Sequence, residues 1–238
     1  MRVVIIGKGR MGTLIAQTLE QAGDTVAATI DIDNFGDLAT LEGADVVIDF
    51  SAPASLDAVC EYVRRTKTPI VSGTTGYTPE QKEQLASLGD DVAVLWSANY
   101  SLGVAVCARV LGQMTEILRP SFDIEVTETH HNQKVDAPSG TAKLWLEHIN
   151  PRGEMTPVYG REGICGKRNP NEIGMHALRG GTVAGTHTVQ FFGDDEEIAL
   201  THRATSRQIF VNGAVHMAGL VATKEAGCYD IQKILFGV

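Results

Sequence analysis

The sequence predicts an α/β protein in two parts: a parallel sheet with helices on both faces, and a second region built around a different kind of sheet. Over the first hundred residues, short runs rich in valine and isoleucine alternate with segments whose apolar residues recur at helical spacing. After Asn99, the strand-like segments instead alternate polar and apolar residues. That alternation is typical of a sheet with one face packed and the other face covered differently.

Five runs in the first part are predicted to be strands. Each is rich in valine or isoleucine and mostly apolar throughout, as expected for strands that helices cover on both faces. They are Arg2–Ile6, Thr25–Asp31, Asp45–Phe50, Pro69–Ser72 and Val92–Trp96.

Helices are predicted between these strands at Met11–Ala22 and Ser55–Arg65, because the apolar residues of each segment fall on one side. A third helix is predicted to begin after Thr78, whose hydroxyl can cap it. Pro79 suits the first turn of that helix, and Gln81 can complete a capping box with Thr78.

In the second part, a long helix is predicted over Leu102–Leu118 and strands over Asp123–Thr127 and His187–Phe191. Residues 150–172 hold several glycines and prolines, which predicts a long loop. The segment Ile209–Lys224 is again predicted to be helical, and we expect it to pack back on the first part.

The composition narrows the class of partner. The 238 residues carry a formal net charge of -9, which argues against nucleic acid or an anionic membrane as a partner. The four cysteines form no closely spaced pair, so we expect reduced thiols rather than disulfides or a zinc site. No apolar segment reaches membrane-spanning length, and a cytoplasmic location is expected.

The stretch VVIIGKGRMGTLIA places Gly7, Gly9 and Gly12 in the spacing Gly-x-Gly-x-x-Gly. It follows a predicted strand and opens a predicted amphipathic helix, which is the context in which this spacing binds a dinucleotide. Gly7 permits a tight turn, Gly9 lets the backbone approach a pyrophosphate, and Gly12 allows close packing of helix on sheet. The amides at the start of the helix favour phosphate groups.

Asp31 ends the second predicted strand, where an acidic residue can bind the adenosine ribose hydroxyls. A carboxylate there favours NAD over NADP. Lys8 and Arg10 lie close enough in sequence to soften that preference, so NADH and NADPH both remain candidates. Two further strand ends, Asp49–Ser51 and Gly73–Gly76, carry small or hydroxyl residues placed to line the nicotinamide side.

A second stretch, residues 128–143, reads ETHHNQKVDAPSGTAK. The adjacent histidines His130 and His131 stand beside Lys134 and form a local positive cluster in an acidic chain. No further histidine or cysteine follows at metal-binding spacing, so no metal is expected here. The cluster predicts a site for an anionic ligand next to a proton donor.

A helix is predicted directly after this cluster, with Ser139 as its N-cap. The backbone N–H groups near Gly140 and Thr141 would then be available to an anion. An oxygen-rich ligand would meet a helix start, the hydroxyl of Ser139 and the ammonium of Lys134 in one place.

These motifs resemble those of the dihydrodipicolinate reductase family. The family's hallmark is matched continuously from Glu128 to Ala142. Other segments match in the same order along the whole chain, namely Asp49–Ser51, Gly73–Gly76, Ser97–Ser101, Arg179–Gly185 and His202–Ala204.

The resemblance implies a Rossmann-type doubly wound domain over residues 1–100, to which residues 208–238 return, and an inserted α+β domain over residues 101–207. The inserted domain would bind substrate and form a homotetramer. The implied reaction is the NADH- or NADPH-dependent reduction of 4-hydroxy-tetrahydrodipicolinate to tetrahydrodipicolinate, with loss of water, in lysine and diaminopimelate biosynthesis.

The resemblance also implies residue roles. His130 would be the catalytic acid and Lys134 its catalytic partner. The expected contacts with the dicarboxylate substrate are His131, Ser139, Gly140 and Thr141. The glycine motif and the resemblance together give the expected cofactor contacts: Gly7, Lys8, Gly9, Arg10, Met11, Gly12, Asp31, Phe50, Ser51, Gly73, Thr74, Thr75, Ser97, Ala98, Asn99 and Tyr100.

Two other functions remain open at this point. An amino-acid dehydrogenase resembling aspartate dehydrogenase would also combine a Rossmann-type domain with a histidine-containing site. A sensor that binds NAD(H) without turnover would need the glycine motif, but it would have no use for the group from His130 to Lys134. The chain also differs from many family members in a shorter glycine loop and a shorter segment between the second and third strands, which leaves the cofactor preference open.

Overall fold

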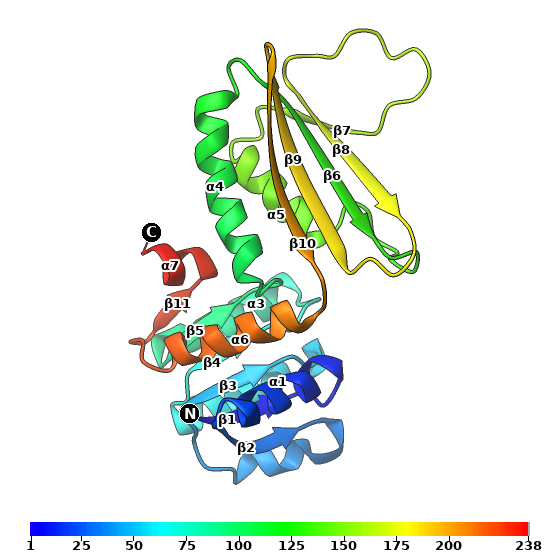
Figure 1. Cartoon of the computed structure of the whole chain (residues 1–238). Coiled ribbons are helices and arrows are strands. Elements are labelled where there is room, and N and C mark those ends of the chain that lie inside the picture. Colours follow the sequence, from blue (N-terminus) through cyan, green and yellow to red (C-terminus); the bar gives the residue numbers. More distant parts are fainter. Residues whose placement is uncertain (238) are drawn as a thin grey trace. The chain divides into compact units, whose positions relative to one another are not determined.

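The computed structural model describes residues 1–237, which fold into two compact units (Figure 1). Unit 1 contains Met1–Ser101 and the C-terminal segment that begins at Gln208. Unit 2 is the continuous segment Leu102–Arg207.

Unit 1 is built on a six-stranded sheet in which every strand pair is parallel. The strand order is β11-β5-β4-β3-β1-β2. The parallel sheet predicted from the alternating pattern is confirmed. The strands are β1 (Arg2–Ile6), β2 (Thr25–Ile30), β3 (Val46–Asp49), β4 (Ile70–Ser72), β5 (Ala93–Trp96) and β11 (Gly227–Tyr229).

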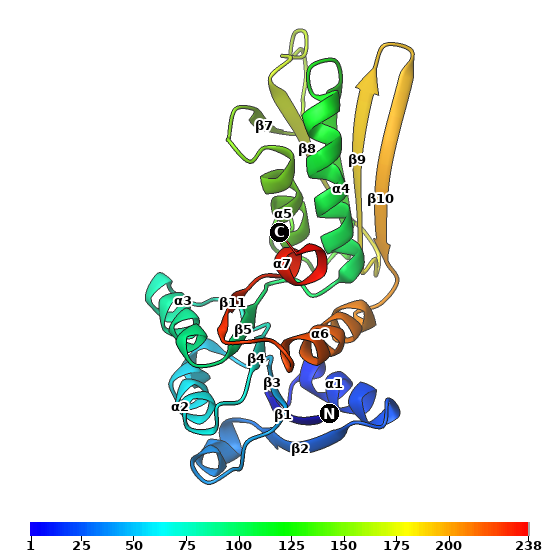
Figure 2. The ribbon, with the colours of Figure 1, turned by 90° about the vertical axis from the view of Figure 1, so that its left-hand side faces the viewer.

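Helices cover both faces of this sheet, which explains why its central strands are almost wholly buried. Figure 2 shows α1 (Arg10–Gln21) and α6 (Gln208–Val221) on one face and α2 (Leu56–Thr66) and α3 (Pro79–Ala86) on the other. A short helix, α7 (Ile231–Phe236), follows β11. Three 3₁₀ segments complete the unit: Ile32–Ala39, Pro53–Ser55 and Ser87–Asp90.

The start of α3 has the capping box predicted from its sequence. The hydroxyl of Thr78 accepts a hydrogen bond from the backbone N–H of Gln81, and the side-chain oxygen of Gln81 accepts one from the N–H of Thr78. Pro79 occupies the first turn.

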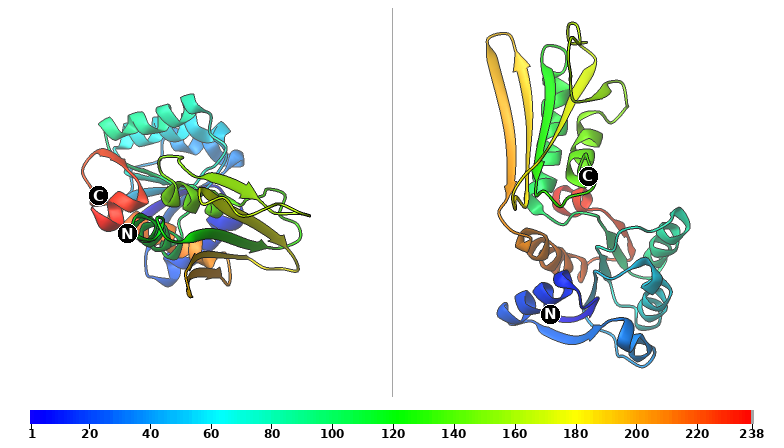
Figure 3. Two further views of the ribbon diagram at one scale, coloured as in Figure 1. Left: turned by 90° about the horizontal axis from the view of Figure 1, so that it is seen from above. Right: turned by 90° about the vertical axis from the view of Figure 1, so that its right-hand side faces the viewer.

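Unit 2 contains a mixed five-stranded sheet in the order β10-β9-β6-β8-β7. The β10–β9 and β9–β6 pairs are antiparallel, whereas β6–β8 and β8–β7 are parallel. Figure 3 shows the long β9–β10 hairpin at one edge, with α4 beside it. The elements are α4 (Leu102–Leu118), β6 (Asp123–His130), α5 (Gly140–Ile149), β7 (Thr156–Tyr159), β8 (Glu172–Arg179), β9 (Gly185–Gly193) and β10 (Glu196–Ala204).

One face of this second sheet carries the core of unit 2. Along β6, buried and partly exposed residues alternate, and the buried ones pack with α4 and α5. The core includes Ile124, Val126, Trp145, Val189 and Phe191. The opposite face, which we call the open face, carries a row of hydroxyl side chains: Thr127, Thr129, Thr186, Thr188 and Thr201.

The prediction of an unbroken loop over residues 150–172 is wrong in part. The structure places β7 within that stretch and begins β8 at Glu172, so the loop proper spans residues 160–171. Pro157 obscured the strand because proline cannot donate a ladder hydrogen bond. It is tolerated here because β7 lies at the edge of the sheet and pairs with β8 alone. Among the described residues, no helix is both long and apolar enough to span a bilayer.

Candidate active site

The glycine loop of unit 1 joins β1 to α1 in the geometry that the sequence predicts. Gly7 has a φ of +102°, a conformation that side chains with a Cβ rarely adopt. A Cβ on Gly12 would lie 1.9 Å from the carbonyl oxygen of Gly7, so only glycine lets the helix approach so closely. Gly9 forms the N-cap and faces open space. The loop therefore has the shape and the helix start that a pyrophosphate needs.

Asp31 lies beside this loop. Its carboxylate accepts hydrogen bonds from the backbone N–H of Lys8 at 3.1 Å and of Ile32 at 2.8 Å. A capping box with Asn34 fixes it at the start of a 3₁₀ segment. The carboxylate is thus held next to the loop, where an adenosine ribose is expected. The side chains of Lys8 and Arg10 are exposed.

Asp49, which closes β3, is a buried carboxylate surrounded by hydroxyl groups. It accepts hydrogen bonds from Ser51, from Ser72 at 2.7 Å, from Thr74 at 2.9 Å and from Tyr77 at 3.3 Å. These bonds tie the ends of β3 and β4 together. The sequence singled out this strand end but not the role of Asp49, although an acid at the end of an apolar strand is the signal.

Aromatic rings and close backbone contacts fill the rest of the predicted nicotinamide side. A Cβ on Gly73 would lie 2.3 Å from the ring of Phe50, and that ring lies 5.6 Å from the ring of Tyr100 between centroids. The hydroxyl of Tyr100 donates to the carbonyl of Ser72 at 2.7 Å. The side chains of Thr74 and Tyr100 are both buried, so their hydroxyls are committed within the unit, whereas Ala98 and Thr75 are exposed.

In unit 2, the predicted catalytic cluster is assembled around Glu128 on β6. The Glu128 carboxylate is almost fully buried, at 1% exposure. Arg179 on β8 donates to both of its oxygens, at 3.0 and 2.8 Å, and the backbone N–H of Ser139 donates to one of them at 3.2 Å. The Nδ1 atom of His130 contacts the other oxygen. Burial raises the pKa of Glu128, but hydrogen bonds from Arg179 and His130 outweigh it and leave that pKa lowered.

His130 lies at the end of β6, on the same inner face as Glu128. Its ring packs edge-on against the ring of His187 on β9, with centroids 5.0 Å apart. Its Nε2 atom would lie 3.0 Å from a Cβ on Gly185, so glycine at that position makes room for the ring. Burial lowers the pKa of His130, Glu128 raises it, and the charges of Lys134 and Arg179 lower it further.

His187 connects the cluster to the start of α5. Its Nε2 atom lies 2.8 Å from the hydroxyl oxygen of Ser139, and Ser139 also caps α5 by accepting from the N–H of Ala142. The Nδ1 atom of His187 is buried and has no hydrogen-bond partner among the described residues. Burial and the nearby His130 lower the pKa of His187 to about 4. Sequence reasoning missed both His187 and Arg179.

The N-cap role predicted for Ser139 is correct, and its predicted contact with substrate stays a prediction. Its hydroxyl and its N–H are both taken up inside the fold, and its side chain is buried. Gly140, the first residue of α5, is exposed. The cap therefore positions the helix start, which keeps its anion-binding character.

The turn that carries His131 and Lys134 is anchored to the segment before β9. The backbone N–H of His131 donates to the carbonyl of Val183 at 2.8 Å, and Lys134 N–H donates to the carbonyl of His131 at 3.2 Å. The ammonium of Lys134 pairs with Asp136 at 2.7 Å. These bonds explain why the segment from Arg179 to Gly185 belongs with the hallmark motif.

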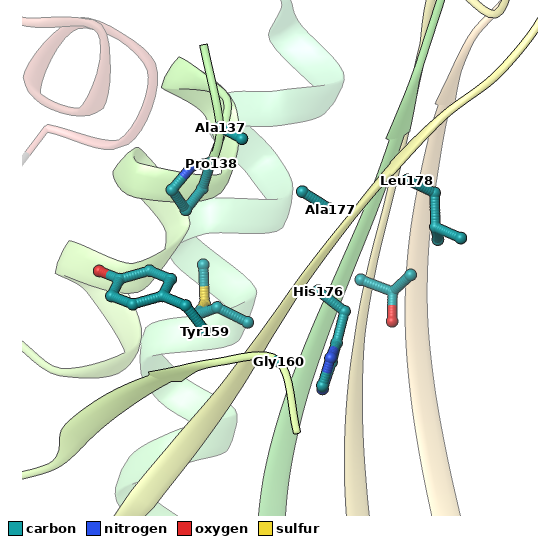
Figure 4. A pocket seen from close by; sticks show the side chains of 9 residues that line it. Ala137, Pro138, Tyr159, Gly160, His176, Ala177 and Leu178 are labelled. Atoms are coloured by element: carbon teal, nitrogen blue, oxygen red, sulfur yellow. The ribbon is translucent and has the colours of Figure 1, made fainter. Parts of the chain in front are cut away.

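Two other features near this cluster do not define the site. Glu128, His130 and His187 lie close enough to hold a metal ion, but the guanidinium of Arg179 already occupies both carboxylate oxygens. A cavity of about 600 Å³, shown in Figure 4, holds no predicted catalytic residue. It is lined by Thr127, Ala137, Pro138, Tyr159, Gly160, Met175, His176, Ala177 and Leu178.

Known proteins share both units. The model of "Dihydrodipicolinate reductase, N-terminus" matches residues 1–100, and that of "Dihydrodipicolinate reductase, C-terminus" matches residues 103–235. The chain is 40% identical over 242 positions to the 4-hydroxy-tetrahydrodipicolinate reductase of Exiguobacterium sibiricum, covering 98% of this chain and 96% of the relative. It is 39% identical over 243 positions to that of Staphylococcus aureus strain Newman, covering 98% and 100%.

Solved structures share the fold. The dipicolinate-bound dihydrodipicolinate reductase of Paenisporosarcina sp. TG-14 aligns with a TM-score of 0.77 at 21% identity, covering 99% of each chain. An amine dehydrogenase from Mycobacterium smegmatis aligns with a TM-score of 0.63 at 9% identity, covering 96% of this chain and 94% of that chain. The matches along the whole sequence show that the chain belongs to the dihydrodipicolinate reductase family.

Proposed function

We propose that this chain catalyses the reduction of 4-hydroxy-tetrahydrodipicolinate to tetrahydrodipicolinate, with loss of water, using NADH or NADPH. An oxidoreductase activity and a place in lysine and diaminopimelate biosynthesis accord with its family. The observation that carries the proposal is the cluster of Glu128, His130 and Lys134 at the start of α5, within a chain that matches the family from end to end.

The residues of unit 1 fit a nicotinamide dinucleotide. The glycine loop offers a helix start to the pyrophosphate, and Asp31 stands where the adenosine ribose is expected. The strand ends held by Asp49 would border the nicotinamide, with Phe50, Gly73 and the exposed Thr75 as candidate contacts. When bound, the reduced nicotinamide supplies the hydride.

The residues of unit 2 fit a ring with two carboxylates. The ammonium of Lys134 can pair with one carboxylate or stabilise negative charge that develops in the ring. The start of α5 at Gly140 and Thr141 can bind the second carboxylate through its backbone. His131 is a further candidate contact, whereas Ser139 would act by positioning the helix start.

His130 is the candidate for the proton that reduction requires. Its ring is held by Glu128 at Nδ1, which leaves Nε2 as the atom that can exchange a proton with a ligand. A positioned general acid typically contributes roughly 10²- to 10⁴-fold to a rate. Lys134, four residues further along the chain, would bind the anionic ring close to that acid.

Two further parts of the proposal concern assembly and location. The open face of the unit 2 sheet, with its threonine row, is partly exposed, which supports a homotetramer built through that face. The four cysteines are unpaired, as expected for the cytoplasm.

One assay tests the proposed reaction. Purified protein is mixed with freshly generated 4-hydroxy-tetrahydrodipicolinate, and the loss of nicotinamide absorbance is followed with NADH and with NADPH in turn. Oxidation that depends on the cyclic dicarboxylate supports the proposal. Oxidation of an amino acid with NAD⁺ would instead indicate a dehydrogenase, which the family match disfavours. Cofactor binding with no turnover of either substrate would indicate a sensor.

A further inference from the structure

Both carboxylate oxygens of Glu128 have hydrogen-bond partners. One oxygen accepts from Nη2 of Arg179 at 2.8 Å and from the N–H of Ser139 at 3.2 Å. The other accepts from Nη1 of Arg179 at 3.0 Å and contacts Nδ1 of His130. A buried carboxylate with a lowered pKa is ionised at neutral pH, so it can only accept hydrogen bonds.

This contact decides which nitrogen of His130 carries the proton. Because Glu128 cannot donate, Nδ1 of His130 must donate to it. Nε2 is then the nitrogen that can gain or lose a proton. Before proton transfer, the carboxylate of Glu128 stabilises the positive charge of the imidazolium. After Nε2 has given its proton to a ligand, the ring is neutral and keeps its other proton on Nδ1.

Arg179 supports the same arrangement from the neighbouring strand. In the β6–β8 register it stands opposite His130, and its two donors grip both oxygens of Glu128. It also donates to the carbonyl of Asp136 at 2.8 Å, which fixes the turn that carries Lys134. Because Arg179 binds both oxygens, the carboxylate of Glu128 is held in a single orientation.

We propose that Glu128, clamped by Arg179, is a positioning residue that fixes His130 in the tautomer protonated on Nδ1 and thereby reserves Nε2 for proton transfer. This inference rests on the proposed function. It adds Glu128 and Arg179 to the machinery as groups that act through His130 rather than on the substrate.

The variant Glu128→Gln tests this with almost no change in volume. The amide of Gln can take two orientations. In the first, its oxygen faces the N–H of Ser139, and its nitrogen faces His130 and one other donor, Nη1 of Arg179. In the reversed orientation, the amide nitrogen faces two groups that are themselves donors, Nη2 of Arg179 and the N–H of Ser139, so two hydrogen bonds are lost. The first orientation is favoured, and it requires Nδ1 of His130 to accept, which moves the ring proton to Nε2.

The readouts are ¹⁵N chemical shifts of labelled histidines and the pH profile of kcat. In the wild-type protein, the neutral ring of His130 is expected to carry its proton on Nδ1, and Glu128→Gln is expected to move that proton to Nε2. If the imidazolium is the acting form, activity falls as pH rises through the His130 pKa. Glu128→Gln should lower kcat about 100-fold and move that fall towards lower pH, because the carboxylate charge that raises the His130 pKa is lost.

Arg179→Gln gives a result of opposite sign. Removing the guanidinium takes away a charge that lowers the His130 pKa, so the fall in activity should move towards higher pH. The other charged or titratable groups facing His130 are His187 on β9 and Lys134 with its partner Asp136. Neither variant substitutes these residues, but Arg179→Gln also removes the hydrogen bond to the carbonyl of Asp136. A general loosening of the fold would not move the two profiles in opposite directions.

Glu125→Gln is the matched control. Glu125 lies on the same strand but on the opposite face, and it also pairs with arginines and a histidine, namely Arg161, Arg168 and His176. It does not contact His130, so the His130 tautomer and the pH profile should be unmoved.

The proposal is overturned if the ring proton stays on Nδ1 in Glu128→Gln, or if both variants move the profile in the same direction. Should Glu128→Gln fail to fold, Arg179→Gln decides alone, and an unmoved or lowered profile overturns the proposal. The ¹⁵N measurement needs no substrate. It therefore determines the tautomer even if the wild-type protein proves inactive on the cyclic dicarboxylate, in which case the proposed function fails separately.

Discussion

Each unit contains a buried carboxylate that several donors hold in place, Asp49 in unit 1 and Glu128 in unit 2. Burying a charge is costly unless hydrogen bonds or an opposite charge compensate it. Asp49 is compensated by hydroxyl groups and Glu128 by a guanidinium, a histidine and a backbone N–H. Both carboxylates hold in place the ends of strands where ligand contacts are expected.

Lys134→Ala is expected to weaken substrate binding while leaving cofactor binding intact. A hydrogen bond to a charged group contributes roughly 1.5–3 kcal/mol, so the KM for the dicarboxylate should rise about 10- to 100-fold. The matched control is Lys67→Ala, which removes a lysine with an ion pair of the same length, 2.7 Å, to Asp91. Equal effects of both changes on the substrate KM would contradict the role of Lys134.

The low pKa of His187 predicts that the folded protein loses stability in acid. Its pKa is about 4 in the folded chain, against 6.5 ordinarily, because burial and His130 disfavour the charged ring. Above pH 6.5 the ring is neutral in both the folded and the unfolded state, so its titration does not change the free energy of unfolding. Between pH 6.5 and 4 the unfolded chain binds the proton first, so the folded state loses up to about 3 kcal/mol.

Urea denaturation across that pH range checks the expectation, with His187→Gln as the comparison. The variant should show a shallower loss of stability between pH 6.5 and 4.5, although His130 and His202, whose pKa values are also lowered, contribute in the same direction. Parallel slopes for both proteins would show that His187 titrates normally.

Among individual site residues, those that could be predicted from the sequence are the ones that lie close together along the chain. His130, His131 and Lys134 were identified because one short motif contains them. Arg179 and His187 were missed because the sheet register, and not the sequence, brings them to the motif: Arg179 stands opposite His130, and His187 stands opposite Glu128. A register between strands about 50 residues apart leaves no local pattern.

Among the elements, α5 depends most on a single residue. Ser139 caps the helix and at the same time satisfies Nε2 of the buried His187. Ser139→Ala therefore removes a cap, which costs about 1 kcal/mol, and leaves a second buried nitrogen of His187 unpaired, which costs roughly 1–3 kcal/mol more.

Thr78→Ala is the matched control for that change. Thr78 also caps a helix, α3, but its cap is exposed and its loss leaves no buried group without a partner. The denaturation midpoint should fall further for Ser139→Ala than for Thr78→Ala. Similar falls would mean that the contact with His187 contributes little.

Three of the strands that the sequence did not predict have a physical reason in common. Strands β1, β3, β4 and β5 and helices α1, α2 and α4 carry strong apolar patterns because they are buried against neighbours, whereas α3 was predicted from its capping box. Strands β7, β10 and β11 lie at sheet edges and are partly or largely exposed, so their sequences carry little apolar pattern. β8 was missed because it follows directly on a loop rich in glycine and proline.

For the whole molecule, the family assignment, the fold class and the reductase activity were predicted from the sequence, and the family matches confirm them. The assembly is a prediction that one substitution can test. Thr188→Glu puts a charge in the threonine row of the open face, next to Thr127 and Thr201. If four chains meet through that face, the change should convert a tetramer to smaller species.

Light scattering after size-exclusion chromatography measures the mass. The control is Thr40→Glu, which adds the same charge at an exposed site in unit 1. A wild-type monomer, or a tetramer that Thr188→Glu leaves intact, would rule out assembly through the open face.

The discontinuous build of unit 1 has a consequence for synthesis on the ribosome. Its sheet is completed by β11, which pairs with β5, and its core by α6, and both lie beyond the whole of unit 2 in the chain. A nascent chain that has emerged only as far as residue 207 holds every strand of unit 2 but exposes one edge of the parallel sheet and the part of one apolar face that α6 covers. Unit 2 can therefore mature first, while the nucleotide-binding half must wait for translation to finish and is the half that chaperones would need to shield.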